Sequence, residues 1–321
     1  MILIVTNRED YTADFLILEL QRRGAHYCRL NTEEFPHRAT MTWRSSMATT
    51  NGTLDLPSGP LRLSEVRSIW YRRPVPPVPS GELTDPVSFA FAIAETEAAL
   101  DGVLRTINCF WVSDPDRIRR AECKPIQLAL AAKLGFSIPE TIITNDPTAA
   151  QDFVRRHDSV VYKPLRQGRV VVGGELQLIY TNVVRNETAN WESVAYAPCL
   201  FQAYVRKSVE VRATVIGHRV LAVAIHSQES ERTLDDWRRQ SADLLRHEPH
   251  DLPANVSALC LKLVETLGLA FGAIDLIRTP AGEYVFLEIN PNGQWAWLQQ
   301  LCPEVPLRES LADLLMATDP P

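Results

Sequence analysis

The amino-acid sequence predicts an α/β protein of two or three domains, and three observations support this. The chain has 321 residues, enough for about two domains of roughly 150 residues each, or for three smaller ones. An apolar run at residues 1–5, a helical pattern from Tyr11 to Arg23 and an apolar run from His26 to Leu30 form a β-α-β opening, which is typical of an open α/β sheet. Further along, β-forming runs come in adjacent pairs, which indicates hairpins.

The rest of the first section is predicted from the same patterns. We expect a hairpin, a strand, a long helix and a closing strand: Met41–Trp43 with Thr53–Leu56 around Asn51-Gly52, Ser68–Arg72, residues 87–107, and Phe110–Val112. The proline-rich residues 74–79 must form an extended loop. The first domain is therefore expected to span residues 1–113.

The middle and last sections are predicted to mix helices with paired strands. The middle section should contain a helix at Leu128–Leu134 with Pro125 in its first turn, strand 142–143, helix Pro147–Arg156, strand Ser159–Lys163, a hairpin of 170–172 and 176–180, and strand Leu200–Val205. The last section should contain strands Val209–Ile216 and Val220–Ile225, a polar binding loop within Ser227–His250, helix 254–267, a hairpin of Phe271–Arg278 and Tyr284–Asn290, and closing helices. We place the domain limits at 114–205 and 206–321.

Composition excludes several classes of protein. Apolar residues make up 45% and charged residues 22% of the chain, as in ordinary globular proteins. The net charge of −6 argues against nucleic-acid binding, which usually needs a basic surface. The sequence contains neither a signal-peptide pattern nor an apolar run of about 18 residues, so we expect no membrane contact and a cytoplasmic location. The six cysteines form no C-x-x-C pair and are expected to be reduced thiols.

The strongest local signal for chemistry is the segment Phe286-Leu287-Glu288-Ile289-Asn290. Side chains alternate along a strand, so Glu288 and Asn290 should share one face while Leu287 and Ile289 face a core. Oxygen ligands of this kind suit Mg²⁺, and Asp275 in the preceding strand could supply a third. The alternative is an ordinary solvated strand face. It is weakened by the carboxylate of Asp275 inside an apolar run, since such a group needs a partner.

Two lysines are candidates for binding phosphate. Lys163 ends an otherwise apolar strand, and Lys124 precedes Pro125 at the start of a helix. A lysine ammonium is a compact charge that suits phosphate oxygens. Each could equally be a surface lysine, and for Lys124 taken alone that alternative is the stronger one.

The order of these residues resembles the ATP-grasp superfamily. The ordered set is Lys124, Lys163, Phe201-Gln202-Ala203-Tyr204-Val205, Glu210-Val211-Arg212, Asp275 and Glu288-Ile289-Asn290. The similarity is greatest to the graspetide synthetases, the microviridin-type maturases of ribosomal peptides. Three further segments carry that closer resemblance: Trp70-Tyr71-Arg72-Arg73-Pro74, Asp236-Trp237-Arg238 and Asn290-Pro291-Asn292-Gly293-Gln294-Trp295.

The resemblance implies an ATP-grasp fold with an N-terminal pre-ATP-grasp α/β domain, a central lid domain and a C-terminal catalytic sheet. It also implies roles for single residues. Those expected to bind ATP are Lys124, Lys163, Gly168 of the lid, the backbone of Gln202, Ala203, Tyr204 and Val205, and Glu210 at the ribose. Those expected to hold Mg²⁺ are Asp275, Glu288 and Asn290, and those expected to act on the γ-phosphate and the acyl-phosphate are Arg212 and Arg238.

The implied activity is an ATP-dependent carboxylate ligase. Such an enzyme would activate Asp or Glu side chains of a ribosomal precursor peptide as acyl-phosphates and form macrocyclic esters or amides with Thr, Ser or Lys. The implied partners are the leader and core of that peptide, and the enzyme would be a homo-oligomer, a dimer or tetramer. Two alternatives stay open: another carboxylate–amine ligase, adding glutamate or joining small amino acids, and a non-catalytic nucleotide-binding module.

Overall fold

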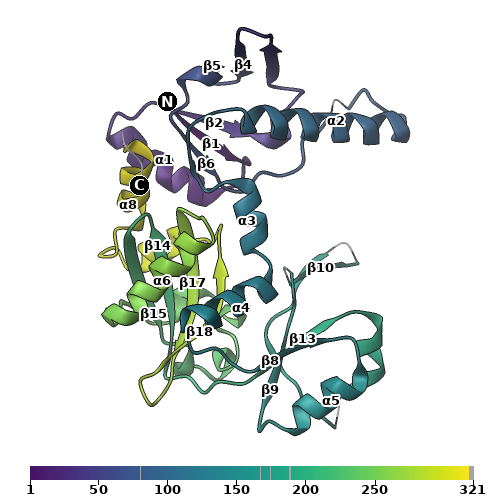
Figure 1. Cartoon of the computed structure of the whole chain (residues 1–321), viewed down its shortest axis with the longest axis vertical. Helices are drawn as coiled ribbons and strands as arrows, with labels where there is room; N and C mark the ends of the chain where they lie inside the picture. The colour runs from purple at the N-terminus through teal and green to yellow at the C-terminus, as the bar shows by residue number, and fades with distance from the viewer. Residues whose placement is uncertain (80, 167, 174, 188, 318–321) are drawn as a thin grey trace.

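The structure, a computed structural model, describes residues 1–79, 81–166, 168–173, 175–187 and 189–317. Figure 1 shows three parts, each built around a sheet: an N-terminal part at the top, a central part at the lower right and a C-terminal part at the lower left. The last helix, α8 (Leu307–Met316), returns to the N-terminal part and lies beside α1 (Tyr11–Arg22). The C-terminal part is therefore attached to the first part by its own chain end.

The N-terminal part contains the parallel sheet that the β-α-β opening predicts. Its strand order is β2-β1-β6-β7, formed by β1 (Ile2–Thr6), β2 (Tyr27–Asn31), β6 (Ser68–Tyr71) and β7 (Phe110–Val112). Side chains alternate along β1, so Leu3 packs with α2 (Pro86–Arg105) while Ile4 packs with α1 and α8. Both faces of the sheet are covered, as parallel sheets require.

The predicted hairpin exists, but its turn is not at Asn51-Gly52. The strands are β3 (Thr40–Ser45) and β4 (Thr50–Leu56), and β5 (Gly59–Arg62) adds a third strand that the sequence did not reveal. Gly52 lies inside β4, paired with Trp43. A Cβ atom on Gly52 would lie 2.7 Å from the Leu63 side chain, so this glycine serves close packing and not the turn.

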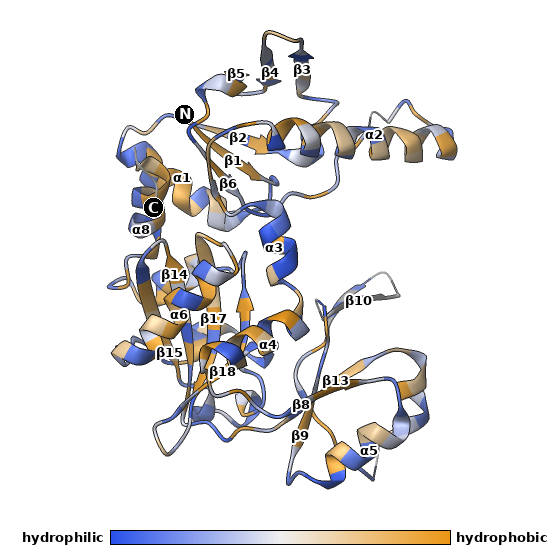
Figure 2. Ribbon diagram, viewed as in Figure 1, coloured by the Kyte–Doolittle hydropathy of each residue, from blue (hydrophilic) through white to orange (hydrophobic). Residues whose placement is uncertain are grey.

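Two helices connect the N-terminal part to the rest. α3 (Pro115–Ala121) was not predicted; Asp114 caps it by accepting hydrogen bonds from the backbone N–H groups of Asp116 and Arg117. α3 is hydrophilic along most of its length (Figure 2), which hides it from a search for hydrophobic periodicity. α4 (Lys124–Leu134) follows, with Pro125 in its first turn as expected.

The central part is a four-stranded antiparallel sheet with one covering helix. The strand order is β12-β9-β13-β8, formed by β8 (Thr141–Thr144), β9 (Val160–Lys163), β12 (Asn182–Val183) and β13 (Cys199–Ala203). α5 (Pro147–Arg155) packs on it through Phe153 and Val154. A separate hairpin, β10 (Arg169–Val172) with β11 (Glu175–Leu178), projects from this sheet toward α3 in Figure 1.

The C-terminal part is a five-stranded antiparallel sheet. The strand order is β16-β15-β14-β17-β18, formed by β14 (Val209–Ile216), β15 (Arg219–Ile225), β16 (His247–Pro249), β17 (Phe271–Arg278) and β18 (Tyr284–Asn290). One face is apolar and packs on α4 and α6 (Ala254–Thr266), through side chains such as Val211, Ile274 and Phe286. The opposite face carries Arg212 and Asp275, and it holds the candidate site described below.

Two further points complete the fold. The polar stretch 227–250 forms short 3-10 turns and then β16, and α7 (Ala296–Leu301) follows the end of β18. Among the described residues, no helix combines the length and the apolar character needed to cross a membrane.

Candidate functional site

The site lies on the polar face of the C-terminal sheet, where three strands bring charged residues into register. Arg212 on β14 is opposite Asp275 on β17, and Asp275 is opposite Glu288 on β18. A register shift after Asp275 makes Leu287 the extra residue of a bulge. Only Ile289 therefore lies in the core, while Leu287 is half-buried, contrary to the expectation that both face inward. The bulge directs Glu288 to the same face as Asp275.

Lys124 forms an ion pair with Glu288 across 164 residues of sequence. The docking of α4 on β18 explains this contact. The buried side chain of Gln127 donates to the Ile289 carbonyl over 2.8 Å and accepts from the Ile289 N–H over 3.2 Å, so it pairs with the strand as a neighbouring backbone would. Sequence analysis missed Gln127, because a glutamine inside a helical pattern gives no sign of such a partner.

The two facing carboxyl groups differ in how readily they ionise. Burial raises the pKa of Asp275, nearby carboxylates add to the increase, and Arg212 only partly opposes it. Burial also disfavours the charged form of Glu288, but the charges of Lys124 and Lys163 outweigh it, so the pKa of Glu288 is lowered. Carboxylates directly opposite each other repel, and a cation between them would relieve that repulsion.

Asn290 occupies the end of the same strand, opposite Ala273 and two residues after Glu288. It is exposed, and its Oδ1 accepts a hydrogen bond from the backbone N–H of Asn292 over 3.1 Å. The three predicted metal ligands thus lie on neighbouring strands at one end of the polar face. Among the described residues, no group of three His, Cys, Asp or Glu side chains could hold a metal; this set has two carboxylates and one amide.

The two predicted catalytic arginines are held by carboxylates in different ways. Arg212 is buried, and its Nε lies 2.8 Å from Oδ1 of Asp275 without the alignment of a hydrogen bond. Arg238 forms a bidentate pair with Asp236: its Nε donates to Oδ1 over 2.8 Å and its Nη2 donates to Oδ2 over 2.6 Å. Asp236 is buried and also accepts from the Thr181 backbone N–H over 2.9 Å, so it ties Arg238 to the start of β12.

Lys163 lies on the central sheet, and its partner is neutral. Its Nζ donates to Oε1 of Gln202 over 2.7 Å, and Nε2 of Gln202 donates to Thr141 over 2.9 Å. Burial lowers the pKa of Lys163 to about 8, although Glu288 partly offsets this by favouring the charged form. Lys163 and Glu288 interact electrostatically although they lie on different sheets, so β9 and β18 come near each other at this point.

In the segment expected to bind adenine, two backbone N–H groups already form hydrogen bonds within the protein. The backbone N–H of Ala203 donates to the Glu140 carbonyl over 2.8 Å, and that of Tyr204 donates to the Ser159 carbonyl over 2.9 Å. These two N–H groups are therefore not free for adenine, and the predicted role of Gln202 to Val205 would need the other backbone groups of the segment. Gln202 is buried and its Oε1 already accepts a hydrogen bond from Lys163, so its side chain holds the lysine in place.

Glu210, the predicted ribose ligand, already has a cationic partner. Nζ of Lys207 donates to Oε1 of Glu210 over 2.6 Å and to the Asp235 carbonyl over 3.3 Å. Lys207 is almost fully buried, and sequence analysis missed it. Only its spacing, three residues before a charged strand position, could have pointed to the pair.

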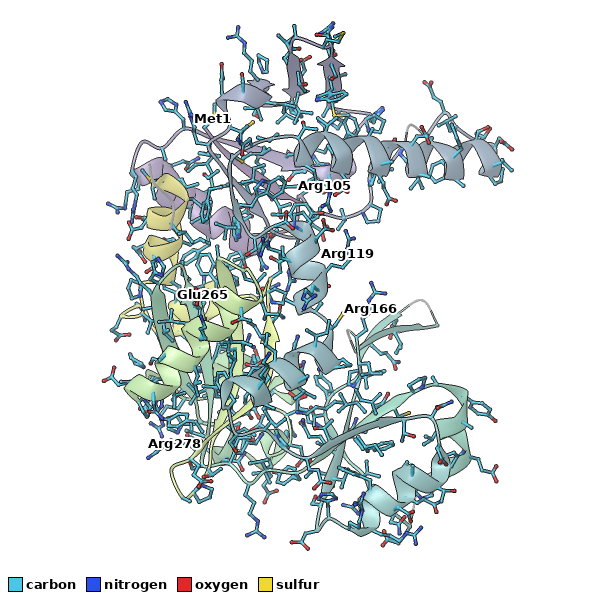
Figure 3. All side chains as sticks on the ribbon, viewed as in Figure 1. Met1, Arg105, Arg119, Arg166, Glu265 and Arg278 are labelled. Atoms are coloured by element: carbon cyan, nitrogen blue, oxygen red, sulfur yellow. The ribbon has the colours of Figure 1, made fainter. Side chains whose placement is uncertain are left out.

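The predicted lid loop is tied to the projecting hairpin. Gly168 accepts a hydrogen bond from the Ile179 N–H over 2.7 Å, and a Cβ on Gly168 would lie 2.4 Å from the Ile179 carbonyl oxygen. A close approach of two backbones therefore requires glycine here. Gln167 lies outside the described residues. Arg166, labelled in Figure 3, interacts electrostatically with Glu122, two residues before Lys124.

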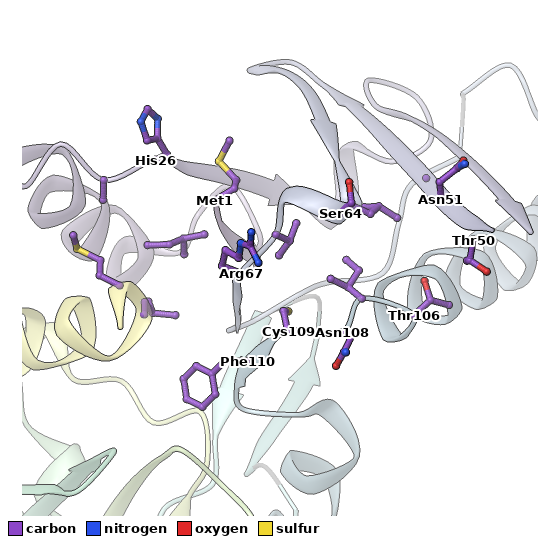
Figure 4. A pocket seen from close by; sticks show the side chains of 18 of the residues that line it. Met1, His26, Thr50, Asn51, Ser64, Arg67, Thr106, Asn108, Cys109 and Phe110 are labelled. Carbon is purple, nitrogen blue, oxygen red and sulfur yellow. The ribbon is translucent and has the colours of Figure 1, made fainter. Parts of the chain in front are cut away.

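A separate hollow of about 790 Å³ lies at the edge of the N-terminal sheet. Figure 4 shows Met1, His26, Arg67 and Phe110 around it. None of the predicted site residues is among the described residues that line it. The chemistry indicated by the polar face is therefore not located in this hollow.

Comparison with known proteins defines the class of this protein. A family model described as the MvdD pre-ATP grasp domain matches residues 1–119. A tetrahydromethanopterin:alpha-L-glutamate ligase from Methanocaldococcus jannaschii is 24% identical over 220 residues, which cover 67% of this chain and 73% of that protein. Other alpha-L-glutamate ligases are covered over 61% of their length. These matches indicate an ATP-grasp ligase, and the solved structures described next show that the chain is one.

Two solved structures resemble the chain over almost its whole length. One is a RiPP-associated ATP-grasp ligase of Chryseobacterium gregarium, in complex with ADP and a leader and core peptide; it has a TM-score of 0.92 and 32% identity, with 99% of this chain and 97% of that chain covered. The other is the macrocyclase MdnC of Microcystis aeruginosa MRC with its precursor peptide MdnA, with a TM-score of 0.85, 28% identity and 98% of each chain covered. The chain belongs to the RiPP-associated ATP-grasp ligases, the graspetide-type maturases, which confirms the resemblance stated above.

Proposed function

We propose that this ligase activates Asp or Glu side chains of a ribosomal precursor peptide as acyl-phosphates and joins them to Thr, Ser or Lys side chains, giving macrocyclic esters or amides. The observation that carries the proposal is the register pair of Asp275 and Glu288, with Lys124 of α4 paired to Glu288 and Lys163 of the central sheet interacting with Glu288. Structural neighbours bound to a leader, a core or a precursor peptide support the choice of substrate.

The residues present fit a divalent cation together with a nucleotide. Asp275 and Glu288 face each other, and the pKa of Asp275 is raised, first by burial and then by the neighbouring carboxylates of Glu288 and Glu210, so a bound cation would favour its ionised form. Asp275, Glu288 and Asn290 would hold Mg²⁺, which prefers a few protein oxygens and shares the rest with phosphates and waters. When bound, the ion would neutralise charge that builds up on the transferring phosphoryl group.

The nucleotide would lie between the two sheets. Lys163 and Lys124 would contact its phosphates, Glu210 its ribose and the segment from Gln202 to Val205 its adenine, with Gly168 in the covering loop. Lys124 must first exchange Glu288 for phosphate, whereas Lys163 has only to leave a neutral amide. A structural neighbour in complex with ADP supports a nucleotide as a ligand.

The chain's own groups would then serve the two chemical steps. A carboxylate is a poor electrophile until its oxygen takes the γ-phosphoryl group, after which phosphate can leave. Arg212 and Arg238 would stabilise the charge on that group and on the departing phosphate, and Asp236 fixes the direction of the Arg238 guanidinium. Exclusion of water would protect the acyl-phosphate, and the hairpin of β10 and β11, which projects from the central sheet, would contribute to it.

We also propose that the leader of the peptide docks on the central part, near that hairpin, and that the enzyme acts as a dimer or tetramer. The test of the function is a reaction of the purified protein with ATP, Mg²⁺ and a Thr- and Asp/Glu-containing peptide encoded next to its gene. We expect ADP release and the loss of one water mass per bond formed. The proposal would be contradicted if the peptides encoded by all neighbouring reading frames kept their mass in this reaction.

A second candidate, addition of glutamate to an acceptor, is favoured by the matched alpha-L-glutamate ligases. The same mass measurement separates the two. Macrocyclisation removes water from one peptide, whereas ligation adds the mass of a glutamate residue and depends on free glutamate in the reaction.

A further inference from the structure

The metal-ligand strand ends in a turn that orients Asn290. The backbone N–H of Gly293 donates to the Asn290 carbonyl over 3.2 Å, and the N–H of Asn292 donates to Oδ1 of Asn290 over 3.1 Å. The second bond makes this an Asx turn, in which the side chain imitates a backbone carbonyl. The backbone N–H of Asn292 thus fixes the direction of the Asn290 amide oxygen, which is the proposed metal ligand.

Close packing on β17 fixes one side of this turn. A Cβ atom on Gly293 would lie 2.4 Å from the Cβ of Ala273, the residue paired with Asn290. The backbone at Gly293 therefore rests directly on the strand that carries Asp275, two residues along. This contact leaves no room for another residue type at position 293.

Arg72, which directly follows β6 of the N-terminal sheet, holds the opposite side of the turn. Its Nη1 donates to the backbone carbonyl of Asn292, so the Asn292 residue is held through its N–H by Asn290 and through its carbonyl by Arg72. Trp70, two residues before Arg72, packs against Trp295, three residues after Asn292, with ring centroids 6.5 Å apart. Two of the segments that carry the closer family resemblance therefore contact each other across two domains.

The position of Arg72 is costly for a residue with only a structural role. The side chain is 1% exposed, and its nearest carboxylate, Asp10, lies 3.5 Å from Nε. Asp10 already accepts hydrogen bonds from Thr6 and Thr12, and among the described residues Nε and Nη2 of Arg72 have no hydrogen-bond partner. Apolar residues usually stabilise a buried interface at least as well as a buried charge. The retained bond to the Asn292 carbonyl indicates a function at the turn.

We propose that Arg72 is a positioning residue for the metal site: by holding the Asn292 carbonyl it orients the amide of Asn290 and so sets the affinity of the site for a divalent cation. The inference rests on the proposed function, because it takes Asn290 as a metal ligand. It makes the N-terminal domain part of the cation site although none of its residues contacts the ion.

The test compares two buried residues at the two ends of one segment: Ser68 begins β6, and Arg72 directly follows its last residue. Arg72→Met removes the bond to the turn and keeps an apolar side chain of similar length. Ser68→Ala is the matched control, because Ser68 also donates to a carbonyl of the C-terminal part, that of Leu315 over 2.7 Å, but far from the turn. The readouts are Mn²⁺ affinity in the presence of ADP, followed by electron paramagnetic resonance, and ADP affinity in the presence of a chelator.

We expect Arg72→Met to weaken Mn²⁺ binding by about tenfold or more, as loss of groups behind metal ligands usually does. Metal-free ADP affinity should stay unchanged, and Ser68→Ala should bind both like the wild type. Mn²⁺ affinity equal to the wild type in Arg72→Met, or an equal loss in Ser68→Ala, overturns the inference. A wild-type protein that binds ADP but never Mn²⁺ would instead overturn the proposed function.

Two further variants keep the test decisive if Arg72→Met does not fold. Arg72→Lys retains the charge and one donor, and it should give an intermediate Mn²⁺ affinity. In an Asn290→Ala background, Arg72→Lys should have no further effect, because the oriented ligand is already gone. Additive losses in the double variant would show that Arg72 acts on something other than Asn290, which also contradicts the proposal.

Discussion

The two sheets that face each other across the proposed nucleotide site present their charges differently. On the C-terminal side, cations and carboxylates are already paired, as in Lys207 with Glu210, Arg212 with Asp275 and Lys124 with Glu288. On the central side, Lys163 is held by the neutral amide of Gln202. One surface is a network that a metal ion would reorganise, and the other holds a desolvated ammonium group ready for an anion.

Under the proposed function, the C-terminal sheet would bind the metal ion and Lys163 of the central sheet would bind the phosphates. A paired network keeps Glu288 ionised but obliges Lys124 to release it when a nucleotide arrives. An ammonium paired with an amide gains a strong, charge-assisted bond when phosphate replaces that amide. Variants on the two sides should therefore fail in different ways.

The largest effect is expected on the C-terminal side. Glu288→Gln removes a carboxylate from the proposed metal set and the partner of Lys124, and turnover should fall by roughly 10³-fold, on the scale of lost transition-state charge stabilisation. The melting temperature should change little, because the side chain lies on a polar face. Measured ADP release near the wild-type rate would break the metal assignment. Glu265→Gln, on the exposed surface of α6, is the matched control and should change neither quantity.

The central side should respond in binding before catalysis. Lys163→Ala removes a charged donor, so ADP affinity without metal should fall by about 10- to 100-fold, corresponding to about 1.5–3 kcal/mol. Lys124→Ala should cost less, since Lys124 gives up Glu288 before it can bind phosphate. Calorimetric titration of both variants checks this order, and equal losses would remove the distinction between the two sides.

The pKa of Lys163 gives a pH dependence with a definite sign. Burial lowers that pKa to about 8, and bound phosphate would raise it again, so binding takes up a proton around this pH. Metal-free ADP affinity should be greatest below pH 8 and should fall by up to about tenfold per unit above it. Lys163→Arg keeps its charge throughout this range and should flatten the profile. A wild-type profile that rises above pH 8 would show the sign to be wrong.

The smallest effect concerns the start of α4. Cys123 occupies the N-cap position, where it makes no side-chain capping bond. Cys123→Asn supplies an oxygen for the free N–H groups and should stabilise the protein by about 1 kcal/mol, with turnover almost unchanged. Thermal unfolding measures this gain, and an equal or lower melting temperature would show that the helix start is already satisfied.

Regular patterns made most of the fold predictable. The apolar run of residues 1–5, the helical spacing before Gly24 and the paired runs of the last section all correspond to elements of the structure. What escaped depended on features without a periodic signal. α3 is short and polar, and Gly52 resembles a turn residue although it serves close packing inside a strand.

The site was predictable only in its ligand types and their order. Glu288 and Asn290 could be assigned to one face by strand period, and the bulge at Leu287 preserves that outcome in a way no sequence pattern shows. Gln127, Lys207 and the contact between Arg72 and Asn292 depend on residues distant in sequence or hidden among ordinary charges. Such partners become visible only when the domains are placed together.

The location of the divalent ion decides whether Asp275, Glu288 and Asn290 form the metal site. Crystals grown with ADP and Mn²⁺ would reveal the ion by its anomalous scattering. We expect one peak bound by oxygens of Asp275, Glu288 and Asn290, with the ADP phosphates between that peak and the ammonium groups of Lys124 and Lys163. A peak away from these three oxygens, or phosphates distant from both lysines, would contradict this expectation.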